Sequence, residues 1–138
     1  MSIVQTQTTS FKKELYQAVH NLSTDTIKIA LYTGNADLNA DTTVYTTSNE
    51  VVATGYTAGG NTLTGVSISS SGSTAYVNWA NTSWMAALTA RCALIYNVTQ
   101  GNKSIAVIDF GADKTSTTTF TITMPSNTST TALIRSSN

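Results

Sequence analysis

The chain has 138 residues, the length of one domain, and its formal net charge at pH 7 is zero because seven basic side chains balance seven acidic ones. Charged residues make up only 10% of the chain, and serine and threonine number 43, so hydroxyl groups replace charges over much of the surface. The basic residues are scattered, which argues against a nucleic-acid partner and against binding to an anionic membrane. We therefore expect a weakly charged domain whose copies can pack closely at little electrostatic cost.

The chain begins with a polar, threonine-rich segment, residues 1–10, in which no periodicity predicts an element. This start has neither the basic region nor the apolar stretch of a secretory signal, and no apolar run in the chain approaches the roughly 20 residues of a membrane span. We predict a flexible N-terminal arm, synthesis in a cytoplasm and no membrane partner.

Residues 10–23 carry the one clear helical pattern. Ser10 is placed to cap a helix, and Asn21 with Ser23 is placed to end it. Apolar side chains recur at helical spacing in between, at Phe11, Leu15, Ala18, Val19 and Leu22. We expect this apolar face to pack against a sheet.

The remainder of the chain shows the pattern of β-strands. Alternating or apolar segments follow one another as "TIKIALYT", "TLTGVSIS", "TAYVNWAN", "RCALIYNV", "KSIAVIDFG", "TFTITM" and "TALIRS". The short connection "TQGN" between the fourth and fifth predicts a hairpin, and Pro125 closes the strand before it. We predict a mainly β fold, an antiparallel β-sandwich of about seven to nine strands with one N-terminal α-helix, in a single domain over residues 11–138.

A glycine-dense segment, "EVVATGYTAGGNTLTG", occupies residues 50–65. Gly59 and Gly60 precede an asparagine and predict a tight turn, and Gly55 is assigned to the same structural class. Gly65 stands where the apolar pattern changes phase, which predicts a β-bulge. A phosphate-binding loop would need a lysine and a following helix, and the segment offers neither. We predict a structural role for these glycines and no bound cofactor.

Four oxygen-bearing side chains alternate in the loop after the first long strand, at Asn35, Asp37, Asn39 and Asp41. They resemble the first half of a calcium-binding loop, but no start position places glycine sixth. Asparagine and aspartate also favour ordinary turns. We expect a turn-rich loop and no metal.

Three further reactive side chains, His20, Cys92 and Asp109, are considered for catalysis. His20 is expected at the surface or an interface, and Cys92 is expected to be a small buried apolar residue; a nucleophile–base pair would require the two to meet in space. Asp109 stands in an apolar run, where it can face solvent at an edge, accept a hydrogen bond from the adjacent turn, or be buried with a raised pKa. We assign no catalytic residue and expect that the protein is not an enzyme.

Two tryptophans, Trp79 and Trp84, bracket "ANTS". Aromatic rings this close can stack against a sugar or a base. The interpretation that we favour is that Trp79 packs in the core and Trp84 closes one end of it.

Three segments carry a resemblance to a known family: "FKKELYQAVHNL", "IKIALYTGNADLNADTTVY" and "NEVVATGYTAGGNTLTG". In this order they resemble small virion structural proteins of tailed bacteriophages, of the kind encoded among the head genes. The resemblance covers roughly residues 11–111, and the third segment is its most specific part. It implies a structural component of the virion, with glycines that mark the fold and no catalytic residues.

The resemblance implies first a capsid decoration, or cement, protein whose partner is the major capsid protein. A tail, fibre or head–tail connector component, in contact with the host surface, is the alternative. Self-association is expected, with a homotrimer favoured and a dimer second. The expected contact residues come from the arm, from the loop 35–50 and from aromatic rings suited to sugar stacking; they are Ile3, Val4, Asp37, Leu38, Tyr45, Tyr56 and Trp84.

Overall fold

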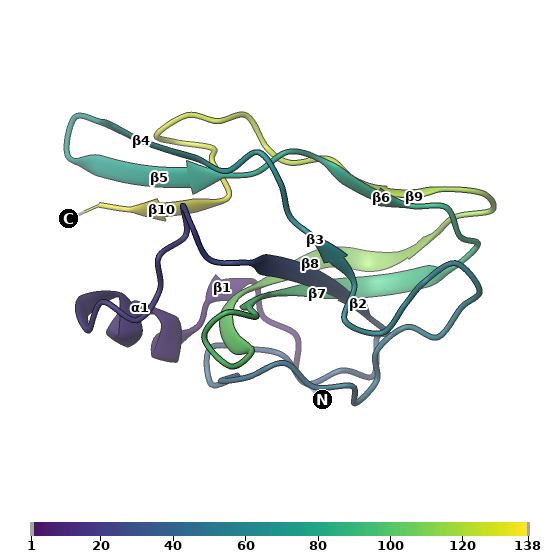
Figure 1. Ribbon diagram of the computed structural model, residues 1–138. Coiled ribbons are helices and arrows are strands. Elements are labelled where there is room, and N and C mark those ends of the chain that lie inside the picture. The colour runs from purple at the N-terminus through teal and green to yellow at the C-terminus, as the bar shows by residue number, and fades with distance from the viewer. Residues whose placement is uncertain (1, 138) are drawn as a thin grey trace.

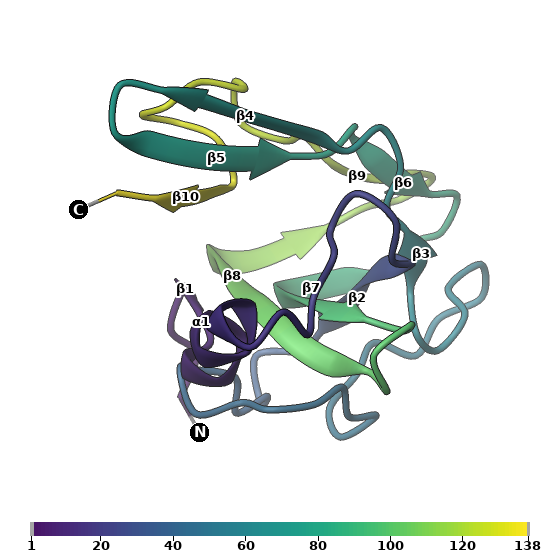
Figure 2. The same cartoon turned by 60° about the vertical axis from the view of Figure 1, so that its left-hand side comes forward.

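The computed structural model describes residues 2–137, and these residues form ten β-strands and one short α-helix in two layers (Figure 1). The first layer, the large sheet, is antiparallel and contains β1 (Thr6–Gln7), β8 (Lys103–Thr115), β7 (Thr89–Asn97), β2 (Ile27–Tyr32) and β3 (Asn61–Thr62), in that spatial order. The second layer lies across it (Figure 2).

The second layer has two parts. One is the small sheet, with β10 (Ile134–Ser136), β5 (Thr74–Asn78) and β4 (Ser67–Ser71) in that order. The other is a two-stranded pair of β6 (Thr82–Trp84) and β9 (Phe120–Ile122). The predicted mainly β fold, an antiparallel sandwich with one N-terminal helix, is therefore confirmed.

The large sheet is buried on both faces because its central strands carry consecutive apolar side chains, from Ile29 to Tyr32 in β2 and from Cys92 to Tyr96 in β7. In β2, Ile29 and Leu31 point into the cluster between the two layers, whereas Ala30 and Tyr32 point into a second cluster on the opposite face. The loop 33–50 covers that opposite face, where Leu38 is 1% exposed. Burial on both faces explains why β2 reads as a continuous apolar run instead of an alternating one.

The predicted hairpin is confirmed as the pair β7–β8, which forms the centre of the large sheet. Its register is irregular between Ala90 and Cys92 and again between Ile95 and Tyr96. Such irregularities sharpen the twist of a strand pair. The long strands can therefore curve beneath the second layer (Figure 2).

The helix α1 (Thr9–Tyr16) is shorter than predicted and begins earlier. Its N-cap is Thr8, not Ser10, and the Thr8 hydroxyl accepts a hydrogen bond of 3.3 Å from the backbone N–H of Phe11. The chain leaves the helix at Ala18, which has a φ of 57°. The expected apolar face is therefore cut short, and Phe11, fully buried, is its main anchor to the core.

The N-terminal segment expected as a flexible arm lies against the domain over residues 2–10. The backbone N–H of Val4 bonds to the carbonyl of Leu38 at 3.0 Å, and the N–H of Leu38 bonds to the carbonyl of Ser2 at 2.9 Å. Further along, β1 pairs with β8, and Thr8 is fully buried. The expected boundary at residue 10 is therefore absent, because this segment supplies the edge strand that β8 would otherwise lack.

No helix within residues 2–137 has the length and apolarity needed to cross a lipid bilayer.

Candidate interaction surface

The glycine-dense segment is held by a buried carboxylate at its start. Glu50 is 7% exposed and accepts three hydrogen bonds: 2.6 Å from the Tyr45 hydroxyl, 2.7 Å from the Tyr56 hydroxyl and 2.8 Å from the backbone N–H of Gly59. A buried carboxylate is tolerated when its oxygens are this well satisfied. The contacts draw the middle of the segment, at Tyr56 and Gly59, onto the side chain at its start.

Tyrosines connect this carboxylate to the large sheet. The Tyr56 hydroxyl accepts a 2.8 Å bond from the backbone N–H of Leu31 in β2, and the Tyr96 hydroxyl of β7 donates a 2.7 Å bond to the carbonyl of Gly59. The rings of Tyr45 and Tyr96 stack with centroids 4.6 Å apart. Burial, assisted by the charge of Glu50, raises the pKa of Tyr96 to about 12 and the pKa values of Tyr45 and Tyr56 also above their ordinary value. The phenols therefore stay protonated and act as donors.

The four glycines singled out from the sequence all have positive φ angles. At Gly60, with φ +80°, an added Cβ would lie 1.8 Å from the carbonyl oxygen of Ile29, and at Gly55, with φ +93°, it would lie 2.4 Å from the carbonyl oxygen of Met85. Backbone approaches this close leave no room for a side chain. The segment is thus a packed turn against β2 and against the chain after β6.

Gly65 does not form the predicted bulge. It lies between β3 and β4, which belong to different layers, and has a φ of +65° with Ala80 as its nearest neighbour. The phase change in the apolar pattern arises because the chain leaves one sheet and enters another. A bulge and a crossing between sheets give the same sequence pattern, which is why the prediction was wrong.

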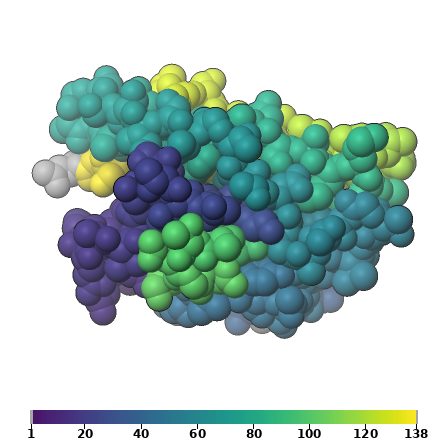
Figure 3. Space-filling model, viewed as in Figure 1, coloured from purple at the N-terminus to yellow at the C-terminus, as the bar shows by residue number. Residues whose placement is uncertain are grey.

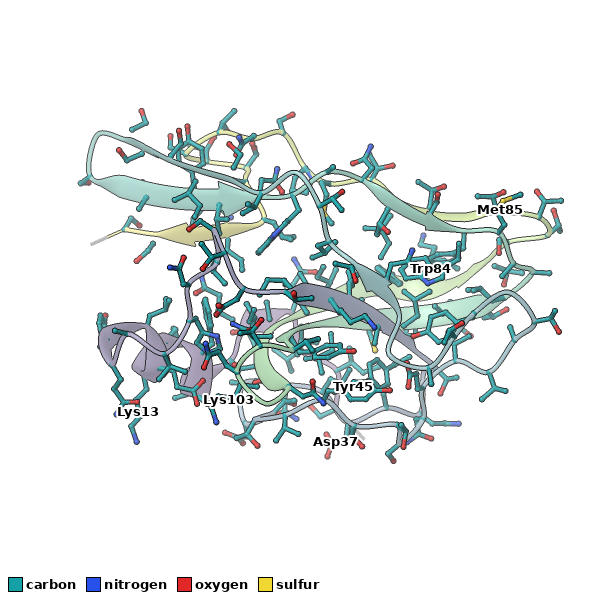
Figure 4. All side chains as sticks on the ribbon, in the orientation of Figure 1. Lys13, Asp37, Tyr45, Trp84, Met85 and Lys103 are labelled. Carbon is teal, nitrogen blue, oxygen red and sulfur yellow. The ribbon has the colours of Figure 1, made fainter. Side chains whose placement is uncertain are left out.

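The expected contact residues of the arm and the loop meet one another instead of projecting outward. Ile3 pairs with Leu38 in a parallel bridge, and Leu38 is buried while Ile3 is partly buried. Only Val4, 48% exposed, and Asp37 remain on the surface. Figure 4 shows Asp37 at the lower margin and Tyr45 above it, turned into the molecule.

The aromatic residues expected to stack on a sugar are mostly inside the protein. Trp84 is 4% exposed, and its ring lies 5.9 Å from that of Tyr56 and 6.2 Å from that of Phe120, measured between centroids. Trp79 is also buried. The packing interpretation of the two tryptophans therefore holds. The neighbouring Met85 points away from the core and is 85% exposed (Figure 4).

His20 is buried, contrary to the expected surface position. Its ring nitrogens lie 2.9 Å from a carboxylate oxygen of Glu14 and 3.0 Å from the side-chain amide of Asn97, and the same amide donates a 2.8 Å bond to Asp25. Burial alone would raise the pKa of Asp25, but hydrogen bonds from Asn97, from the backbone of Asn21 and from Gln100 hold it below its ordinary value. The cluster ties the chain after α1 to the end of β7.

Cys92 is fully buried, as predicted. Burial, with a contribution from the charge of Asp109, raises the pKa of its thiol to about 12, so the nucleophilic thiolate is scarce near neutral pH. The hydrogen-bonding partners of His20 are Glu14 and Asn97, not Cys92. The nucleophile–base pair considered from the sequence does not form.

Asp109 accepts the hydrogen bond from the adjacent turn that the sequence allowed. The N–H of Gly111 bonds to its carboxylate at 2.8 Å, and Arg91 bonds to the same oxygen at 3.2 Å. The bond from Gly111 and the pairing with Arg91 lower the pKa of Asp109, so the alternative of a raised pKa is wrong.

The alternating loop 35–41 is built from local turns. The Asn39 amide donates to Asp37 at 3.1 Å, and the Asn39 side-chain oxygen accepts from the backbone N–H of Asp41 at 2.9 Å. Within residues 2–137, no three histidine, cysteine, aspartate or glutamate side chains are grouped closely enough to hold a metal ion.

One cleft of mixed polarity, one apolar groove and several isolated apolar side chains remain accessible. A cleft of about 730 Å³ opens between β8 and β9 and contains Phe110, Phe120 and Met124. A groove of about 460 Å³ lies between α1 and the small sheet. The most exposed large apolar side chains elsewhere are Val52 at 97% and Tyr16 at 93%.

Ile68 on β4, 56% exposed, is one of the accessible apolar residues that the sequence did not predict. Its strand alternates apolar and polar residues in the segment "GVSISSS", which predicts one buried face but does not reveal that β4 lies at an edge. The edge position follows only from the strand order.

The chain matches no protein-family model, and comparisons with curated proteins and with solved structures find no similar protein.

Proposed function

We propose that this protein is a structural component of a tailed-bacteriophage virion that binds the assembled capsid and stabilises it, as a decoration protein. The observation that carries the proposal is that the segment with the most specific resemblance, residues 49–65, is built around the buried carboxylate of Glu50 as a rigid support. The partner is the major capsid protein, and the protein acts without catalysis or cofactor.

The reactive side chains support a binding role because each of them is engaged within the fold. Glu50 accepts hydrogen bonds from two tyrosine hydroxyls and a backbone N–H. His20 is hydrogen-bonded to Glu14 and Asn97. Asp109 accepts hydrogen bonds from Arg91 and from the turn that follows it. What the surface offers instead is hydroxyl groups, few charges and single apolar side chains. Such a surface suits extensive contact with another protein shell.

The proposed mechanism is stabilisation by mass action. A protein that binds the assembled lattice and not the free subunits shifts the assembly equilibrium toward the shell. Each contact can be weak, because the same contact repeats over many lattice sites and self-association links neighbouring copies. The homotrimer was the first expectation for that self-association; the exposed edge of the small sheet, considered below, favours the dimer.

Co-sedimentation tests the proposal. Purified protein is mixed with empty capsid shells of the phage that encodes it, and the shells are challenged with heat or denaturant with and without the protein. We expect the protein to pellet with the shells in a saturable ratio and to raise the temperature at which they dissociate. Protein that stays in the supernatant, with shells of unchanged stability, would contradict the proposal.

A tail, fibre or head–tail connector component remains the alternative. The aromatic contacts first expected for a host sugar are weakened as support, because Tyr56 and Trp84 are buried and Tyr45 is held by Glu50. Tyr16, an aromatic ring that is 93% exposed, would have to take over that role. Antibody labelling of intact particles separates the two proposals, since it marks the head in one case and the tail in the other.

A further inference from the structure

The outer edge of β4 is the starting point of a second, independent inference. β4 ends the strand order β10-β5-β4, and within residues 2–137 no strand pairs with its other side. Four of its five residues are exposed. In Figure 3 the β4–β5 hairpin, in teal, forms the upper left border of the molecule.

The backbone of this edge is free to bond at two positions. Gly72 and Ser73 form a two-residue turn, so the pair at its neck, Ser71 and Thr74, exchanges both backbone hydrogen bonds. Bonded and non-bonded pairs alternate along an antiparallel ladder. The N–H and C=O groups of Ile68 and Ser70 therefore point away from β5 and toward the open edge.

Side chains cover part of three other edges. The Gln7 amide donates a 3.0 Å bond to the carbonyl of Arg135 on β10, and the Gln5 side chain accepts a 3.1 Å bond from the N–H of Asp109 on β8. Asn61 donates a 2.8 Å bond to the carbonyl of Ser83 on β6. On β4 the Asn127 amide donates a 2.9 Å bond to the Ser67 hydroxyl, but within residues 2–137 no side chain bonds to the backbone of Ile68 or Ser70. The strand also contains neither the charged residues nor the proline that usually protect an edge strand.

The inner face of the small sheet adds an apolar contact to this edge. Ile134, Val77 and Ile68 are direct cross-strand neighbours and form one row across the three strands. Ile134 is 6% exposed and Val77 is 5% exposed, but Ile68, at the end of the row, is 56% exposed. The row borders the groove beside α1. The row ends at the sheet edge with Ile68, of which about half is exposed to solvent.

We infer that β4 pairs antiparallel with β4 of a second copy of this chain, so that Ile68 lies opposite the partner's Ile68. Two three-stranded sheets then become one continuous sheet of six strands, and the apolar row runs on into the partner. A twofold axis perpendicular to the sheet produces this pairing and satisfies the outward backbone groups of both copies at once.

A second copy fits this edge better than a different partner because the edge is complementary to itself. Residues 67–71 carry no charge, so two copies meet without like-charge repulsion. The Ile68 side chain of each copy covers the exposed part of the same side chain in the other copy. A trimer would need β4 to pair with a different strand of the next copy, and that pairing would lose the contact between the two Ile68 side chains. The inference does not rest on the virion proposal.

Analytical ultracentrifugation of the full chain over a wide concentration range tests the inference. We expect a reversible monomer–dimer equilibrium. Ile68→Lys places two charges opposite one another, and Ser70→Pro removes an outward N–H without touching the ladder to β5. Each variant should weaken the dimer at least about tenfold. Val52→Lys, the same kind of exchange in an exposed loop, is the matched control and should leave the equilibrium unchanged.

Cross-linking gives a positive readout that does not depend on a weakened complex. Cys92 is buried, so Ile68→Cys introduces one accessible thiol per chain. Mild oxidation should convert this variant to a covalent dimer, whereas Val52→Cys should cross-link only slowly by random collision.

Three results would overturn the inference. They are a wild-type chain that stays monomeric at every concentration, a trimer, and a dimer that Ile68→Lys and Ser70→Pro leave intact. Circular dichroism and thermal unfolding of each variant, compared with the wild type, establish that a loss of association is not a loss of folding.

Discussion

The large sheet and the small sheet are both antiparallel, yet they are protected from solvent to different degrees. In the large sheet, β2 and β7 are buried on both faces, and side chains such as Gln5 cover the outer groups of β8. In the small sheet, β4 is exposed along most of its length and is bordered by solvent. The centre of the large sheet is enclosed and only the end of β8 is exposed, whereas the small sheet has an open edge along β4.

This difference shows that a weakly charged chain can use one sheet to stabilise the fold and leave another sheet available for contact with a partner. Two carboxylates stabilise the region of the large sheet. Glu50 accepts hydrogen bonds from two tyrosine hydroxyls and a backbone N–H, and Asp109 accepts hydrogen bonds from Arg91 and from the N–H of Gly111. The open edge of the small sheet, β4, consists of serine and one isoleucine, so it carries no charge that would repel a second copy. We conclude that the large sheet carries the fold and that the small sheet is the better candidate for contact. The predictions below test this division.

The largest expected effect is at Gly60, beside the large sheet. Gly60→Ala forces a side chain against the Ile29 carbonyl in a left-handed conformation, and we expect it to lower the free energy of unfolding by about 3 kcal/mol or more. Gly72→Ala, in the turn of the small sheet, also has a positive φ but meets no atom within 4 Å, and should cost about 1 kcal/mol. Denaturant unfolding measures both. Equal losses would remove the distinction between the two regions.

The second effect concerns the tyrosine that links Glu50 to β2. Tyr56→Phe removes a donor to Glu50 and leaves the backbone N–H of Leu31 without its acceptor, so we expect a loss of about 1–3 kcal/mol. Tyr76→Phe makes the same chemical change on the partly exposed β5 and should alter stability by less than about 0.5 kcal/mol. If Tyr56→Phe left the free energy of unfolding unchanged, the hydrogen bonds around Glu50 would not stabilise the fold.

The third effect is a difference in thiol reactivity. Cys92 lies fully buried in the large sheet with a raised pKa, so a thiol reagent should label the native wild-type chain only as fast as it unfolds. Ile68→Cys should add one thiol that reacts at once in dilute solution. Rapid labelling of native wild-type protein would mean that the large sheet opens readily, contrary to the account.

The smallest effect is the dependence of stability on pH. The pKa of Asp109 in the folded protein lies below its ordinary value. The contribution of Asp109 to the free energy of unfolding is therefore complete above the unfolded-state pKa of about 4, and it is lost as the pH falls through the folded-state pKa. Asp109 and Arg91 are partly exposed, so Asp109→Asn should cost less than about 1 kcal/mol at neutral pH and flatten the decline below pH 4. Asp113→Asn serves as the control on the same strand. Thermal unfolding is measured between pH 2 and 7. The assignment would be contradicted if the stability of both variants declined with falling pH as steeply as that of the wild type.

The sequence predicted the parts of the fold that local patterns determine. The apolar run of β2, the hairpin β7–β8 and the closing strand β10 each contain enough residues of one kind to define them. The packed turn at Gly59 and Gly60 follows from the same local chemistry, because glycine tolerates the positive φ that both residues adopt.

The sequence could not predict the features that depend on contacts distant in the chain. The sequence of residues 1–10 predicts no element, yet residues 2–10 are held in place by contacts with Leu38 and β8. Trp84 and Tyr56 are equally suited to a surface or a core until the layers are in place. The exposed edge at Ile68 exists only because of the strand order, which periodicity does not report.

Hydrogen–deuterium exchange resolved to single amides tests the division between the two sheets most directly. At low protein concentration, the amides of Ile68 and Ser70 should exchange quickly while those of β7 stay protected; at high concentration, Ile68 and Ser70 should become protected and β7 should not change. Protection of β4 that is independent of concentration, or loss of protection across β7 under the same native conditions, would contradict the account.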